Sequence, residues 1–302
     1  MNRSWGYLSA LTVALLFGIW FSLDKTLLGY LHPFALAALT YLIASVFLFF
    51  VNFSPLKNRI LDVINRDDQL ENFMSRKDYG LIFITAVFGS LTAPALYLSG
   101  LSRITAVNAA LLTNVEILFI IVIGIFFLKE EVHKKDILGF AFLLLGAIFL
   151  STNNLQNITF NQSLFGSLLV VSASFFWSLD TSLSKFLSRK QNIIFVTALK
   201  SGIGGSILLV LSLILGLNFT LPLFRLPLLL FIGIVAVSFS LVLIYYSLRN
   251  IGSTRTGSIF ALSSLFGAVT AFIVLNEPLT PLQLSFGVLM LVGVFVLYKS
   301  GK

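Results

Sequence analysis

The chain has 302 residues, of which 58% are hydrophobic and 11% are charged, and its mean hydropathy is +0.99. So few charged side chains cannot cover the surface of a water-soluble globule, so the composition excludes a soluble domain and indicates an all-α polytopic membrane protein. The chain has no cysteine and only two histidines, His32 and His133, so we expect no disulfide, no metal site and no cofactor.

Ten apolar stretches are long enough to span a bilayer, because a hydrocarbon core of ~30 Å needs about 20 helical residues. In chain order the predicted spans are residues 5–23, 33–53, 79–101, 105–128, 135–151, 164–186, 193–217, 223–248, 252–275 and 281–298. Pro94 lies inside the third span and predicts a kink there. The charged segment 54–78 fits either an amphipathic helix on the membrane surface or a solvated loop.

Lysine and arginine predict the orientation, because they accumulate on the cytoplasmic side of a membrane protein. With a cytoplasmic N-terminus, all but four of the 20 basic residues lie on inner segments. Lys25, Arg103 and Arg225 then lie outside, and Lys200 lies within a span. We therefore expect both termini in the cytoplasm and the protein in a cell (inner or plasma) membrane. The net charge of +8 then needs no nucleic-acid partner.

The two halves of the chain repeat each other. Ser22-Leu23-Asp24 recurs as Ser178-Leu179-Asp180, and residues 128–150 align without a gap with residues 275–297, at a shift of 147 residues. Five spans per half is an odd number, so the second copy must enter the membrane in the opposite orientation. The prediction is two inverted five-helix repeats, residues 1–153 and 154–302, an arrangement typical of secondary transporters.

Glu116 is the carboxylate that this span assignment places nearest the middle of the membrane. It lies about eleven residues into the fourth span, close after Asn114. Ionisable groups at such depth usually face a cavity or a partner. Glu116 can bind the ammonium group of a substrate, take up a coupling proton, or bridge helices as a neutral structural carboxyl.

Lys200 and Asp180 are predicted at similar depth, ~12 Å and ~9 Å from the cytoplasmic surface at a rise of ~1.5 Å per residue. A structural ion pair between them and the binding of a substrate carboxylate or phosphate by Lys200 are both open interpretations. Asp24 and Lys25, at the outer end of the first span, predict a pair at the membrane interface.

Two tryptophans lie next to the repeated Ser-Leu-Asp element, and Trp177 is too deep for an interfacial residue. It can stack on a substrate or pack in the core. The candidate substrate-binding residues are Trp20, Tyr97, Asn114, Glu116, Trp177, Asp180, Lys200, Tyr246 and Ser263, and Glu116 is also the candidate for proton coupling. No HExxH, P-loop, GxSxG or CxxC motif occurs, so we expect no enzyme, and transport driven by a gradient or by exchange.

Several stretches carry a resemblance to a known family: LLFGIWFSLDKTLL (15–28), SRITAVNAALLTNVEILF (102–119) and FFLKEEVHKKDILGFAFLLLGAIFL (126–150), with the second-half counterparts SFFWSLDTSLSK (174–185) and FIVLNEPLTPLQLSFGVLMLVGVFVL (272–297). Through them the whole chain resembles the drug/metabolite transporter (DMT) superfamily, EamA type. The resemblance implies a ten-helix bundle with a central cavity between helices one to four and six to nine. Glu116 stands where the family often has Glu-Pro, and Ile117 replaces that proline.

Members of this superfamily export amino acids and other metabolites or exchange organic anions, so the resemblance does not give the substrate. We expect a secondary transporter or exporter that moves a small amphipathic metabolite across the lipid bilayer by alternating access. An amino acid or similar zwitterion is the first choice, because Glu116 and Lys200 offer opposite charges at comparable depth. The alternatives are an exchanger of phosphate esters or nucleotide derivatives, and a non-transporting membrane scaffold.

Overall fold

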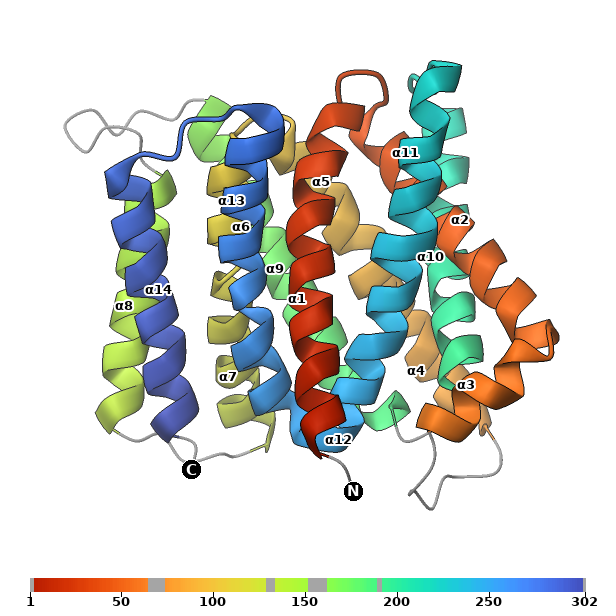
Figure 1. The fold of residues 1–302 in the computed structure, drawn as a ribbon, viewed down its shortest axis with the longest axis horizontal. Coiled ribbons are helices and arrows are strands. Elements are labelled where there is room, and N and C mark those ends of the chain that lie inside the picture. The colour runs from red at the N-terminus through yellow and green to blue at the C-terminus, as the bar shows by residue number, and fades with distance from the viewer. Residues whose placement is uncertain (1–2, 65–73, 129–133, 152–161, 189–191, 301–302) are drawn as a thin grey trace.

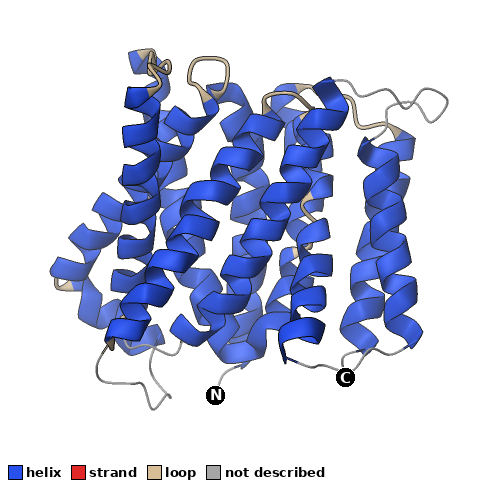
Figure 2. Ribbon diagram, turned by 180° about the vertical axis from the view of Figure 1, so that it is seen from behind, coloured by secondary structure: helices blue, strands red, loops and turns tan. Residues whose placement is uncertain are grey.

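The computed structural model describes residues 3–64, 74–128, 134–151, 162–188 and 192–300. Every regular element within these ranges is helical (Figure 2). The elements are α1 (Arg3–Leu27), α2 (Pro33–Phe53), α3 (Leu56–Ile64), α4 (Arg76–Ala86), η1 (Val87–Thr92), α5 (Ala93–Leu101), α6 (Ala106–Leu112), α7 (Val115–Leu128), α8 (Lys134–Ser151), α9 (Gln162–Leu187), α10 (Ile193–Ile214), η2 (Leu223–Arg225), α11 (Leu226–Phe231), η3 (Ile232–Phe239), α12 (Ser240–Phe260), α13 (Leu262–Leu275) and α14 (Pro281–Ser300).

Six helical stretches are long and apolar enough to cross a membrane, and the protein is therefore an integral membrane protein. They are Ser4–Leu27, Pro33–Phe53, Arg76–Leu101, Gln162–Leu187, Ile193–Ile214 and Leu223–Ile251, and they match the first three and the sixth to eighth predicted spans. The other four predicted spans correspond to shorter apolar helices, Ala106–Ile120, Ile137–Gly146, Leu262–Leu275 and Pro281–Val296.

The fourth and ninth predicted spans are not single straight helices. The fourth breaks at Thr113 and Asn114, although Ile117 replaces the proline of the family pattern. The ninth breaks at Ala261. Polar side chains stabilise both breaks, because the Thr113 hydroxyl donates to the Ala110 carbonyl at 2.6 Å and the Ser264 hydroxyl donates to the Ala261 carbonyl at 2.8 Å. Backbone groups freed within a membrane must be satisfied in this way.

The gap predicted between the eighth and ninth spans is helical in the structure, but the chain turns back around it, as predicted. Helix α12 runs through residues 249–251 and ends only at Phe260. Within this stretch Arg249 donates from Nε to the Ser188 carbonyl at 2.7 Å. The hydroxyls of Ser247 and Thr256 lie 2.9 Å apart, whereas nine positions of straight helix would separate them by ~13.5 Å, so the chain changes direction between these two residues.

Two membrane helices contain a wide, π-helical stretch, η1 in the third span and η3 in the eighth. Pro94 is the second residue after η1 and has no N–H to donate to the preceding turn, which accounts for the irregular hydrogen bonding at this site. The kink signal that Pro94 gives in the sequence thus corresponds to a π-helical turn in the structure.

The helices form one bundle with an outlying pair (Figure 1). Within the bundle, α2 packs on α10, α1 packs on α12 and α13, and α5 and α7 pack on α9. Helices α8 and α14 pack mainly on each other, and the Gly293 backbone approaches the Gly139 carbonyl so closely that a Cβ there would lie 2.9 Å from it. The start of α1 and the end of α14 lie at the same end of the bundle (Figure 1).

Helix α3 covers part of the charged segment between the second and third spans. Its apolar residues Ile60 and Leu61 pack against the Leu48 and Val51 side chains of α2. The amphipathic-helix interpretation therefore holds for Leu56–Ile64, and residues 65–73 of the segment lie outside the described ranges.

Candidate functional site

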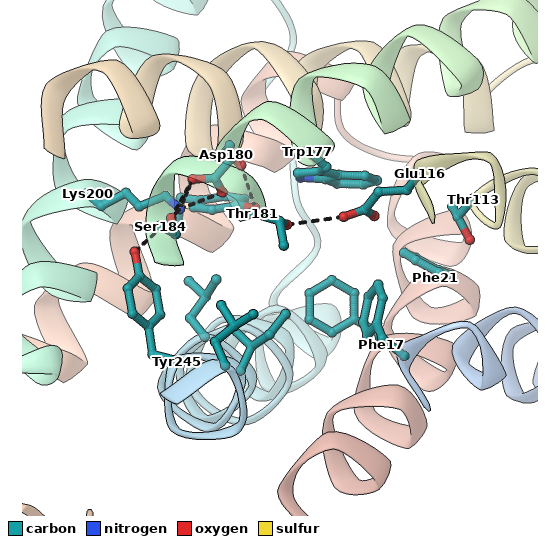
Figure 3. A pocket seen from close by; sticks show the side chains of 16 residues that line it. Phe17, Phe21, Thr113, Glu116, Trp177, Asp180, Thr181, Ser184, Lys200 and Tyr245 are labelled. Carbon is teal, nitrogen blue, oxygen red and sulfur yellow. Dashed lines mark hydrogen bonds and ion pairs between the residues drawn. The ribbon is translucent and has the colours of Figure 1, made fainter. Parts of the chain in front are cut away.

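A pocket lies inside the bundle between α1, α2, α7, α9, α10 and α12 (Figure 3). Polar groups lie at both ends of the pocket, and aromatic rings lie between them. Its volume is about 50 Å³, which is room for a few water molecules. A metabolite can therefore bind there only if the surrounding helices move apart.

One end of the pocket contains a buried ion pair. Lys200 is 1% exposed, and its Nζ contacts both Asp180 carboxylate oxygens at 2.5 Å. The Ser184 hydroxyl donates to Asp180 Oδ1 at 2.9 Å, and the Tyr245 hydroxyl donates to Ser184 Oγ at 3.0 Å. The Lys200 ammonium also lies 5.9 Å from the centre of the Tyr245 ring. The charge of Lys200 is thus already balanced, and an anionic ligand must compete with Asp180 for it.

Glu116 forms the opposite polar corner of the pocket. Its side chain is 6% exposed, and Oε1 accepts a hydrogen bond from the Thr181 hydroxyl at 3.2 Å (Figure 3). No lysine or arginine among the described residues pairs with it. The break at Thr113 and Asn114 places Glu116 in the first turn of α7, where the partial positive charge of a helix N-terminus favours an anion. The arrangement suits the binding of one cationic group.

Aromatic rings form the wall between these two polar groups. Phe17 and Phe21 of α1 lie on one side, Trp177 of α9 lies on the other, and Phe260 closes the pocket against Phe17 at a ring distance of 4.9 Å. Aromatic faces attract cations and accommodate apolar substituents equally well. The wall therefore suits a ligand with a positive group and an apolar body.

Four of the nine candidate residues come together in this pocket, namely Glu116, Trp177, Asp180 and Lys200. Trp20 and Tyr97 lie just behind its wall, where the Tyr97 ring is 5.2 Å from that of Trp177 and the Trp20 ring is 6.4 Å from that of Tyr41.

The other three candidates lie away from the pocket. Asn114 donates to the Ser264 hydroxyl at 2.9 Å and so joins the two helix breaks, with Ser263 buried beside that contact. Tyr246 lies one position from Tyr245, the tyrosine that lines the pocket. Neighbouring side chains on a helix point about 100° apart, so which of the two tyrosines lines the pocket depends on which face of α12 turns toward it.

Thr181, Ser184 and Tyr245 are pocket residues that sequence reasoning missed. Helical spacing was the available signal, because Ser184 follows Asp180 by four residues and therefore shares its face. Leu241, Tyr245 and Leu248 follow the same spacing along α12, and all three line the pocket.

The interfacial pair predicted for Asp24 and Lys25 is wrong. The Lys25 ammonium instead donates to the carbonyls of Leu101 and Ile104 at 2.5 and 2.6 Å. Asp24 is only 1% exposed and turns into the bundle. Near the same end, Glu277 accepts a hydrogen bond from the Val107 backbone N–H at 3.0 Å. These contacts tie α1 and the end of α13 to the turn between α5 and α6.

The comparisons with known proteins agree with one another. The model of the EamA-like transporter family matches residues 4–152 and 164–299. An uncharacterised transporter of Methanothermobacter thermautotrophicus is 46% identical over 303 residues, which cover 100% of this chain and 88% of the relative. The uncharacterised transporter YyaM of Bacillus subtilis is 24% identical over 295 residues, 95% of this chain and 92% of YyaM. One crystal structure, 17% identical, shares the fold with a TM-score of 0.69 over 98% of this chain and 96% of that one.

Proposed function

Because the chain belongs to the EamA-like transporter family and is a membrane transporter, we propose that it is a secondary active transporter of small amphipathic metabolites that carry an ammonium group. The best candidates for the substrate are amino acids or similar zwitterions. The protein would export them by alternating access. The observation that carries the proposal is Glu116, a buried carboxyl with no paired cation among the described residues, in a pocket walled by aromatic rings.

In this proposal the two ends of the pocket recognise the two ends of the substrate. The substrate ammonium binds Glu116 between the faces of Phe21 and Trp177. A substrate carboxylate binds the Lys200 ammonium and shares it with Asp180. A substrate with only anionic groups is disfavoured, because Lys200 is the one cation that lines the described pocket and Asp180 already neutralises it.

We further propose ten membrane spans arranged as two inverted repeats, residues 1–153 and 154–302, with both termini in the cytoplasm. Two irregularities of the helices support the repeat. The breaks at Asn114 and Ala261 are related by the shift of 147 residues that aligns the sequences of the two halves. The same shift places η1 (Val87–Thr92) within the bounds of η3 (Ile232–Phe239).

Single cysteines in this cysteine-free chain test the topology. Ser75 precedes the third span and Ser102 follows it, and both are exposed. We expect a membrane-impermeant maleimide to label Ser75→Cys only from the cytoplasmic side and Ser102→Cys only from the outside. Labelling of both from the same side would contradict the proposed orientation of this span, and labelling with the two sides exchanged would place the termini outside.

A ligand panel followed by a flux assay tests the function. A ligand that binds only the folded protein at a hundred times its dissociation constant adds ~2.7 kcal/mol of stability. We expect amino acids or other small amines to raise the unfolding temperature, and the best of them to show counterflow in proteoliposomes. Stabilisation by phosphate esters alone would favour the anion exchanger. Binding with chemical turnover and no flux would contradict a transporter.

A further inference from the structure

Asp24 is a second buried carboxyl, separate from those of the pocket. It lies at the start of the last turn of α1 and is 1% exposed. Phe17 and Phe21, which line the pocket, precede it by seven and three residues. This spacing places Asp24 on the pocket-facing side of α1, ~4.5 Å further outward along the helix axis than Phe21. Asp24 therefore continues the pocket face toward the outer end of the bundle.

The Asp24 carboxyl has no cation to neutralise it. The neighbouring Lys25 is engaged by two backbone carbonyls. Among the described residues Asp24 forms no salt bridge, and its Oδ1 has no hydrogen-bond partner. Its buried polar neighbours are the uncharged indole of Trp20 and the Tyr97 hydroxyl, and that hydroxyl has no hydrogen-bond partner among the described residues. A charged carboxylate in such surroundings is costly, so this conformation is stable only when the charge is removed.

Asp180 is the counterpart of Asp24 in the repeated Ser-Leu-Asp element, so the two carboxyls can be compared. Asp180 has Lys200 as a partner on the pocket side, whereas Asp24 has none. Phe21 and Trp177 of the pocket wall both contact the Tyr97 ring, at ring distances of 4.9 and 5.2 Å, and Tyr97 lies near Asp24. Asp24 does not line the pocket, and it lies next to Lys25, which makes the contacts at the outer end.

We propose that Asp24 is the proton-binding site of an outer gate. With the outer end closed, as in the structure, the carboxyl holds a proton. Opening the outer end admits water to Asp24, and the acid then releases that proton to the outer solution and becomes a carboxylate. Closing the end again takes one proton back from the same side. This inference rests on the proposed alternating access, and it differs from coupling at Glu116 because no proton crosses the membrane.

The chemistry at Asp24 suits a proton better than a metal cation. A hard cation such as sodium or calcium needs several oxygen ligands, and the described residues contain no group of three or more acidic or metal-binding side chains. The only other polar groups noted beside Asp24, the Tyr97 hydroxyl and the Trp20 N–H, are uncharged, and the indole N–H cannot bind a cation.

Few other titratable groups face Asp24. Lys25 shares its helix, Tyr41 comes from α2, Tyr97 comes from α5, and Glu277 follows α13. Among the elements packed on α1, the sequences of α6, η3 and α13 contain no acid or base. The titratable residues of α12 lie toward the cytoplasmic end.

His32 is another titratable group at the outer end, and an experiment must distinguish its titration from that of Asp24. Burial and the charge of Arg103 lower the pKa of His32, and its Nδ1 accepts the Phe34 N–H as the cap of α2. Because asparagine is also a good helix cap, His32→Asn removes the titration while it keeps the cap.

Outer accessibility measures the gate without any substrate. Ala106 is 0% exposed in the turn held by Lys25 and Glu277, whereas Ser102 nearby is exposed. The readout is the labelling rate of Ala106→Cys divided by that of Ser102→Cys, with an impermeant maleimide outside sealed vesicles. Because opening releases one proton, this ratio should rise with outer pH, by up to about tenfold per pH unit.

The variants identify the titrating group. Asp24→Asn, which mimics the protonated acid, should keep the ratio low at every pH, Asp24→Glu should restore a pH dependence, and His32→Asn should behave as the unmodified protein. A ratio that does not change with outer pH in the unmodified protein would overturn the proposal even if Asp24→Asn fails to fold. So would an unaltered pH dependence in Asp24→Asn, or a dependence on sodium in place of pH. Labelling that responds to pH in a protein with no flux would leave the gate intact and reject the transport function.

Discussion

Glu116→Gln should fold normally and lose substrate binding or pH-driven transport. Glutamine nearly preserves the volume of the side chain and can still accept the Thr181 hydrogen bond. It cannot balance an ammonium group in a buried pocket, and loss of one partner of a buried charge pair costs about 2 kcal/mol or more, which is at least about 30-fold in affinity. The measurements are ligand-induced thermal stabilisation, counterflow, and pH-driven flux in proteoliposomes.

The pattern of losses assigns the role of Glu116. Loss of binding, counterflow and flux together would identify substrate recognition. Loss of pH-driven flux with counterflow retained would identify proton coupling. Glu277→Gln is the matched control, because it makes the same chemical change at a carboxyl outside the pocket and should leave binding intact. Full activity of Glu116→Gln with an unaltered pH profile would contradict both roles.

Lys200→Met should destabilise the protein by about 3–5 kcal/mol, because it leaves the Asp180 carboxylate buried without its cation. Adding Asp180→Asn should recover most of this loss, as expected for directly coupled residues. Unfolding temperature in nanodiscs gives the stability of the four proteins of the cycle. Lys185→Met, on the same helix as Asp180 but without an ion pair among the described residues, is the control and should change stability little.

Transport by the double variant then separates structure from recognition. If Lys200 binds a substrate carboxylate, the stable double variant should fail to transport zwitterions and should still bind simple amines at Glu116. If the pair is only structural, the double variant should transport both. A stable Lys200→Met protein with unchanged transport would exclude both roles for Lys200.

The sequence predicted the parts of the site that depend on depth. Asp180 and Lys200 were placed at similar depth by counting residues from the helix ends, and the structure pairs them. Residues whose position depends on the helix face were harder to predict. Tyr245 and Tyr246 are equally deep, and only the packing of α12 decides that Tyr245 enters the pocket.

The helix breaks could not be read from composition. Breaks in membrane helices are usually signalled by proline or glycine, and residues 113–114 contain neither. What stabilises this break is the contact of Asn114 with Ser264, 150 positions further along the chain. Long-range packing also explains Asp24, since Tyr41 of α2 and Tyr97 of α5 lie beside it and its burial does not follow from its place near a helix end.

The π-helical segment η1 sets the rotational phase of α5 relative to α4. A wide turn holds one extra residue, and one residue corresponds to about 100° of rotation about a helix axis. Gly89 of η1 has no side chain, and its backbone accommodates the Asp180 carboxylate. Deleting one residue from Val87–Thr92 would restore a regular helix. With Gly89 kept in place, the deletion would rotate Tyr97 away from Phe21 and Trp177. The length of this segment is therefore fixed more strictly than its side chains, and functional relatives should align through it without insertions or deletions.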